Sequence, residues 1–183
     1  MNEGFGKLFW GFLFVFIEIH FVFIDILPDP IGYILIYTGL GIIVSKYPTI
    51  HVEKARGFAL ALIFFSVPSI FIAQNEINEQ VFTVWSTYSF LLEIVQFILI
   101  FYVFRVMLEL SIELGSDALY KGTSNLLKVY ITLFVVVTVF QSFAINLYNS
   151  PLIGLIIFFN VLLFVVMIVF LVHLRRFKKW QQE

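Results

Sequence analysis

Six apolar runs, separated by short polar segments, occupy most of this chain of 183 residues. A run of about 20 apolar residues has the length that a helix needs to cross a bilayer, where only helices and closed barrels satisfy their backbone hydrogen bonds. We therefore predict an all-α, polytopic membrane protein in which the whole chain forms one six-helix transmembrane bundle. The predicted spans cover residues 8–27, 31–46, 57–73, 82–104, 125–146 and 151–174.

The composition excludes several other classes of protein. Hydrophobic residues make up 61% of the chain and charged residues only 13%, whereas a soluble domain has about 25% charged residues. A cytosolic enzyme, a nucleic-acid-binding protein and a disordered chain are therefore excluded. Because the chain contains no cysteine, disulfides, thiolate metal sites and a cysteine nucleophile are excluded as well.

Prolines and polar residues mark the ends of the apolar runs. Pro28 ends the first run and Pro30 suits the first turn of the second, so a tight hairpin is expected between them. Thr123 or Ser124 is expected to cap the fifth helix. The helical pattern of the fourth run can continue to Gly115, which would make this helix protrude on the cytoplasmic side.

The basic residues fall on one side of the six predicted spans. Because the spans alternate in direction, both termini and the segments near residues 45–56 and 105–128 face the same side. The positive-inside rule therefore predicts a multi-pass plasma-membrane protein with cytoplasmic N- and C-termini. The 11 basic residues on that side are Lys7, Lys46, Lys54, Arg56, Arg105, Lys121, Lys128, Arg175, Arg176, Lys178 and Lys179.

Ionisable side chains inside the predicted spans are candidates for function. A charged residue at the centre of a membrane helix costs about 2.5–3.5 kcal/mol on insertion scales, so it tends to face the bundle interior or a water-filled cavity. Glu18 in the first span and Glu93 in the fourth are both expected near the midplane, where they can meet. Asp25 follows Glu18 on the same helix face, two turns nearer the outside.

A stripe of polar residues surrounds Glu93 on the fourth span. Ser86, Ser89, Glu93 and Gln96 are spaced by three, four and three residues, which places them on one face of a helix. Such a stripe can line a cavity that opens to the outside. In the sixth span, Asn160 is a further polar group inside the membrane, although asparagines at such positions more often hold helices together.

Motifs for metal binding and hydrolysis are absent from the sequence. It contains neither the metalloprotease motif H-E-x-x-H nor the hydrolase motif G-x-S-x-G, so an enzymatic function is unsupported and no cofactor is predicted. His51 and His173 are expected to be in contact with solvent. Gly32, Gly39 and Gly41 of the second span are expected to let helices approach closely.

The segment from Asp25 to Leu40 reads Asp-Ile-Leu-Pro-Asp-Pro-Ile-Gly-Tyr-Ile-Leu-Ile-Tyr-Thr-Gly-Leu. It resembles a hairpin with the pattern Leu-Pro-Asp-x-Ile-Gly-Tyr in small uncharacterised membrane proteins of Gram-positive bacteria. This resemblance implies a bacterial plasma-membrane protein and brings no activity with it. In size and number of spans the chain is also similar to the substrate-binding subunits of energy-coupling-factor vitamin transporters, although its first span lacks their ladder of small residues.

These observations predict a protein that binds or translocates a small solute or ion through midplane carboxylates. The alternative is a non-transport scaffold or regulatory subunit, in which the polar residues only mediate packing between helices or with a partner. The expected partners are the lipid bilayer, a small solute or cation, and a membrane protein or second copy of the chain, but no nucleic acid. The predicted binding residues are Glu18, Glu93, Gln96, Asp25 and Asn160.

Overall fold

The computed structural model describes residues 2–18, 29–68, 84–144 and 152–180. Within these ranges the chain is helical and has no β-strand, which confirms the all-α prediction. The described helices are α1 (Asn2–Glu18), α2 (Asp29–Lys46), α3 (Ile50–Phe65), α5 (Val84–Glu113), α6 (Asp117–Ala144) and α7 (Leu152–Trp180).

Three of these helices are long and apolar enough to cross a membrane. The segments that qualify are Thr87–Glu113, Asp117–Ser142 and Gly154–Lys178. The longest helix, α5, has 30 residues, or about 45 Å at 1.5 Å per residue, so it exceeds the ~30 Å hydrocarbon core of a bilayer. The helices α1, α2 and α3 are shorter, with 17, 18 and 16 residues.

The helix that follows the turn after α5 is capped by a different residue from those expected from the sequence. Gly115 has a φ of 62°, a left-handed conformation that glycine adopts without strain and that ends α5. Ser116 then caps α6, because its hydroxyl oxygen accepts a hydrogen bond from the backbone N–H of Leu119 at 3.4 Å. The prediction of a cap at Thr123 or Ser124 is therefore wrong, since both residues lie inside α6.

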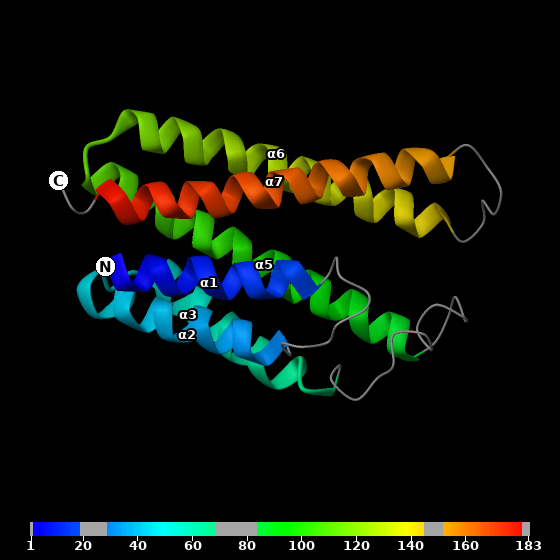
Figure 1. The fold of residues 1–183 in the computed structure, drawn as a ribbon, viewed down its shortest axis with the longest axis horizontal. Coiled ribbons are helices and arrows are strands. Elements are labelled where there is room, and N and C mark those ends of the chain that lie inside the picture. The colour runs from blue at the N-terminus through cyan, green and yellow to red at the C-terminus, as the bar shows by residue number, and fades with distance from the viewer. Residues whose placement is uncertain (1, 19–28, 69–83, 145–151, 181–183) are drawn as a thin grey trace.

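The helices form a closed ring that follows their order in the sequence. Each helix packs against the next, and α7 packs back against α1 (Figure 1). Aromatic contacts join α7 to α1: Phe5 stacks on Phe177 with ring centroids 5.5 Å apart, and Phe170 meets Phe12 edge to face at 5.2 Å and Phe16 at 6.5 Å. Aromatic pairs of this kind add to the stability from apolar burial.

The described start of the chain, at α1, and its described end, at α7, lie at the same end of the bundle (Figure 1). The α2–α3 and α5–α6 turns lie at that end too, and we call it the termini end. The opposite end, called the far end, holds the last residues of α1, α3 and α6 and the first residues of α2, α5 and α7.

Glycines allow α1 and α2 to pack closely. A Cβ atom added to Gly11 would lie 2.7 Å from the carbonyl oxygen of Gly32, and one added to Gly4 would lie 2.9 Å from that of Gly39. The expected packing role of Gly32 and Gly39 is therefore confirmed. Around Gly41 the nearest atoms belong to an arginine of α3, 3.8 Å or more from an added Cβ, so this glycine does not mediate a close helix contact.

Candidate functional site

A cavity of about 440 Å³ lies between α5, α6 and α7, near the far end of α1. Of these helices, α5 lies beside α6 at the termini end and diverges from α6 and α7 toward the far end (Figure 1). Pockets of roughly 300–1,000 Å³ are the usual size for small-molecule binding. The cavity is therefore large enough for an organic ligand.

Polar side chains from three helices line this cavity. They are Glu93 and Gln96 of α5, Thr138 and Gln141 of α6, and Asn160 of α7. Three of the five predicted binding residues are thus brought together. At 1.5 Å per residue, Glu93 lies about 13 Å from the first residue of α5, and Asn160 lies about 12 Å from that of α7.

The polar groups of the cavity differ in their hydrogen bonding. Thr138 and Asn160 each donate a hydrogen bond of 2.9 Å to the carbonyl oxygen four residues earlier in their own helix. Within the described part of the chain, no group forms a hydrogen bond or ion pair with the side chains of Glu93, Gln96 or Gln141. No described group therefore competes with a ligand for this carboxylate and these two amides.

Aromatic side chains form much of the remaining wall. Phe97 stacks on Phe134 with ring centroids 4.1 Å apart and on Tyr130 at 5.5 Å. Phe16 of α1 and Phe164 of α7 also line the cavity. The described lining residues include one carboxylate and no lysine, arginine or histidine.

The other predicted site residues have different positions. Glu18 is the last residue of α1, but its side chain lies outside the described residues, as does the whole of Asp25. A meeting of Glu18 with Glu93 therefore stays a prediction. From the predicted polar stripe, Ser89 is half-buried but is not among the lining residues.

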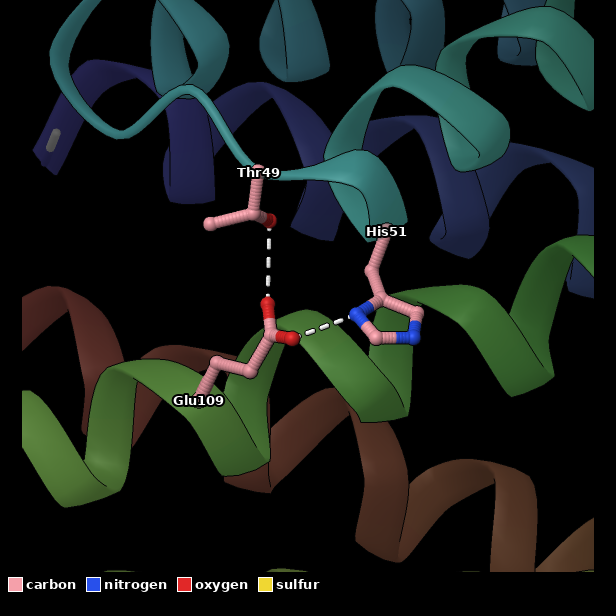
Figure 2. A network of polar contacts seen from close by, with 3 residues as sticks. All are labelled: Thr49, His51 and Glu109. Atoms are coloured by element: carbon pink, nitrogen blue, oxygen red, sulfur yellow. Dashed lines mark hydrogen bonds and ion pairs between the residues drawn. The ribbon is translucent and has the colours of Figure 1, made fainter.

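A second polar cluster joins α3 to α5 at the termini end (Figure 2). Thr49 donates a hydrogen bond of 2.9 Å from its hydroxyl to Oε2 of Glu109, and Nδ1 of His51 contacts Oε1 of the same carboxylate. The side chains of His51 and Glu109 are 22% and 27% exposed. The expectation that His51 would be simply solvated is therefore wrong.

Tyr47, in the turn before α3, adds to the polar character of this region. Burial, the charges of Glu113 and Glu109, and a hydrogen bond to Glu113 raise the pKa of Tyr47 above its ordinary value of 10.0. Both carboxylates belong to the last turns of α5. The neutral phenol is therefore the form that fits the folded protein.

A third polar contact joins α6 to α7. Thr123 donates a hydrogen bond of 2.7 Å to the carbonyl oxygen of Leu119, and Nε2 of His173 lies 2.8 Å from the Thr123 hydroxyl oxygen. Because the single hydroxyl hydrogen points to Leu119, His173 is the donor in the second bond. His173 is only 6% exposed and Thr123 is fully buried, so the expectation of a solvated His173 is wrong.

The described residues offer no obvious metal centre, because no group of three or more histidine and carboxylate side chains occurs among them. No protein-family model, curated protein or solved structure matches the chain. A carboxylate with amides and aromatic rings around it is an arrangement suited to binding a small molecule.

Proposed function

We propose that this protein is an integral membrane protein that binds or translocates a small solute or ion through the cavity between α5, α6 and α7. The observation that carries the proposal is that Glu93, Gln96 and Asn160 line one cavity of about 440 Å³. Ionisable side chains inside membrane helices are costly and usually mark a binding or transport path.

The proposed location is the plasma membrane of a bacterium, with six spans and both termini in the cytoplasm. The confinement of all basic residues to one side of the predicted spans supports this orientation. The grouping of the chain ends and of two turns at the termini end is compatible with it. The bacterial origin rests on the resemblance of the Leu-Pro-Asp-Pro-Ile-Gly-Tyr hairpin.

In the proposed mechanism Glu93 exchanges a proton for a cation. An uncompensated carboxylate is unfavourable at this depth, so the empty site holds a proton on Glu93. An entering cation supplies the compensating charge, and the proton leaves. Glu18 would take part in the same exchange if the two carboxyl groups share the site, as the sequence predicts.

The proposal is tested in liposomes that contain the purified protein and a trapped pH-sensitive dye. A gradient of Na⁺, K⁺ or a small organic cation should move protons in the parent protein. The double variant Glu18→Gln and Glu93→Gln keeps the shape of the side chains but removes titration, so its cation movement should lose its pH dependence. Glu113→Gln, the same change at the termini end of α5, is the control and should behave as the parent does.

Retention of both the flux and its pH profile in the double variant would show that the carboxylates do not couple the movement. A parent protein that moves no protons with any of these cations would favour the scaffold function instead. Hydration of the cavity can be measured as a second test by labelling introduced cysteines, because the chain has no cysteine of its own. Thr138→Cys, in the cavity wall, should react with a water-soluble maleimide faster than Val169→Cys, which is exposed on α7 outside the cavity.

A further inference from the structure

We propose that the ligand of the cavity is an organic cation with a single positive charge and an apolar, aromatic body. This inference rests on the proposed function and names its ligand class. Three features of the cavity carry it: the charge of its lining, the chemistry of its walls and the side from which it can be entered.

The charge of the lining selects for a monovalent cation. Among the described residues that line the cavity, Glu93 is the one carboxylate and no side chain is basic. An anion would find no positive partner among these residues, and a neutral ligand would leave the carboxylate uncompensated or protonated. A single positive charge on the ligand therefore balances the site.

A bare metal ion fits the cavity poorly. Hard cations such as Ca²⁺ require about six to eight oxygen ligands at short range. The lining offers one carboxylate and three amide side chains, from Gln96, Gln141 and Asn160, spread over three helices around about 440 Å³ of space. Most of this volume would remain unfilled around an inorganic ion, whereas an organic body would occupy it.

The walls favour an aromatic body on that cation. Five of the described lining residues are aromatic: Phe16, Phe97, Tyr130, Phe134 and Phe164. Aromatic faces attract cations and also bury apolar surface, and both effects grow when water is excluded. The stacked rings of Phe97 and Phe134, 4.1 Å between centroids, provide a rigid part of this wall.

The cavity can be entered from the side of the bundle. Ile157 and Val161 line it and are 59% and 54% exposed, and Glu93 is exposed as well. In a bilayer these exposed apolar side chains face lipid. A lipophilic cation that dissolves in the membrane therefore reaches Glu93 without crossing the far end of the bundle.

The test measures equilibrium binding of tetraphenylphosphonium to the purified full-length protein in detergent. We expect saturable binding that Glu93→Gln weakens about tenfold and that Glu93→Asp, which keeps the charge, largely retains. Phe97→Leu should weaken binding about threefold through the loss of a wall ring. The matched controls on the same helix are Glu113→Gln and Phe101→Leu, neither of which lines the cavity, and both should bind as the parent does.

A neutral competitor shows whether binding depends on the positive charge of the ligand or only on its aromatic body. Triphenylphosphine oxide has a similar aromatic body without a charge, and we expect it to compete at least tenfold less well. Equal competition by this compound, or unchanged affinity in a Glu93→Gln protein with the elution profile and melting temperature of the parent, would overturn the inference and assign the cavity to an apolar chain such as that of a lipid.

The outcome is independent of the liposome experiment. Proton movement driven by Na⁺ or K⁺ without tetraphenylphosphonium binding would overturn the ligand class and leave the proposed function standing. Binding that depends on Glu93 without any proton movement would overturn translocation and support the ligand class.

Discussion

His51 of α3 contacts the carboxylate of Glu109 of α5 across 58 residues of sequence. The other oxygen of that carboxylate accepts a hydrogen bond from Thr49 (Figure 2). Glu109 of α5 thus contacts both Thr49, which precedes α3, and His51, which lies in the first turn of α3. The beginning of α3 is fixed against α5 by this contact.

Removal of the Glu109 charge should weaken this attachment. We expect Glu109→Gln to lower the free energy of unfolding by about 1 kcal/mol, a modest amount because the pair is partly exposed. Glu53→Gln, at an exposed position of α3, is the matched control and should have no effect. The measurement is chemical unfolding in mixed micelles. A double-mutant cycle with His51→Gln should give a coupling energy, and zero coupling would mean that the contact does not contribute.

Tyr47 should make the protein sensitive to alkaline pH. Burial and the nearby carboxylates Glu113 and Glu109 raise its pKa from 10.0 in the folded protein. The folded state therefore holds the phenol proton at pH values where the unfolded chain releases it. This contribution to stability is complete below about pH 10 and is lost as the pH rises through the folded pKa.

Replacement by phenylalanine tests this effect. The Tyr47→Phe variant has no proton to release, so its melting temperature should fall less steeply than that of the parent between about pH 9 and about pH 11. Thermal unfolding in detergent at a series of pH values provides the measurement. Parallel curves for the two proteins would show that Tyr47 does not titrate differently on folding.

The glycine contacts between α1 and α2 predict a strong effect for a single methyl group. In Gly11→Ala the added Cβ would lie 2.7 Å from the carbonyl oxygen of Gly32, so the helices must separate, and we expect a loss of about 1–3 kcal/mol in stability. Gly57→Ala is the control because nothing lies within 4 Å of its added Cβ. It should be neutral or stabilising, since alanine is the better helix former. Equal melting temperatures for the two variants would contradict the close packing.

Thr123 should be more important for stability than other threonines of α6. The Thr123→Val variant keeps the shape but leaves the N–H of His173 without its acceptor in a buried site, which costs about 1–3 kcal/mol. Thr138→Val is the control, since the Thr138 hydroxyl bonds to a carbonyl oxygen of its own helix. Unfolding of both variants in detergent should show a clearly larger loss for Thr123→Val, and losses of the same size would contradict a structural role for the bond to His173.

The proposed orientation is tested by reporter fusions. Fusions after Lys54, Lys121 and Glu183 should report the cytoplasm, and fusions at Asn78 and Asn149 should report the outside, because the basic residues hold their segments on the cytoplasmic side. A C-terminal reporter on the outside would contradict the six-span arrangement.

Local sequence patterns were sufficient for the all-α class and for one face of the site. The apolar runs predict helices, and the spacing of three residues between Glu93 and Gln96 places both on the face that lines the cavity. The same periodicity identifies polar residues within a helix, such as Asn160, without indicating which helices they share a site with.

Contacts between distant residues could not be derived in this way. His51 and His173 find their partners 58 and 50 residues away, and no local pattern of charge or polarity encodes such pairs. The cap at Ser116 had a usable signal, because a serine directly after a glycine often begins a helix. Gly11 shows its importance only once Gly32 lies opposite to it.

Because the helices form a closed ring, the chain could begin and end at a different turn and still place the same helices side by side. Because α7 packs against α1, with Phe177 on Phe5, the contact that closes the ring does not depend on a peptide link. A short linker between the chain ends and a cut in the turn at 114–116 would both lie at the termini end. Such a circular permutant would retain every pair of neighbouring helices, and the cavity between α5, α6 and α7 would form from two segments that no longer follow one another in the chain.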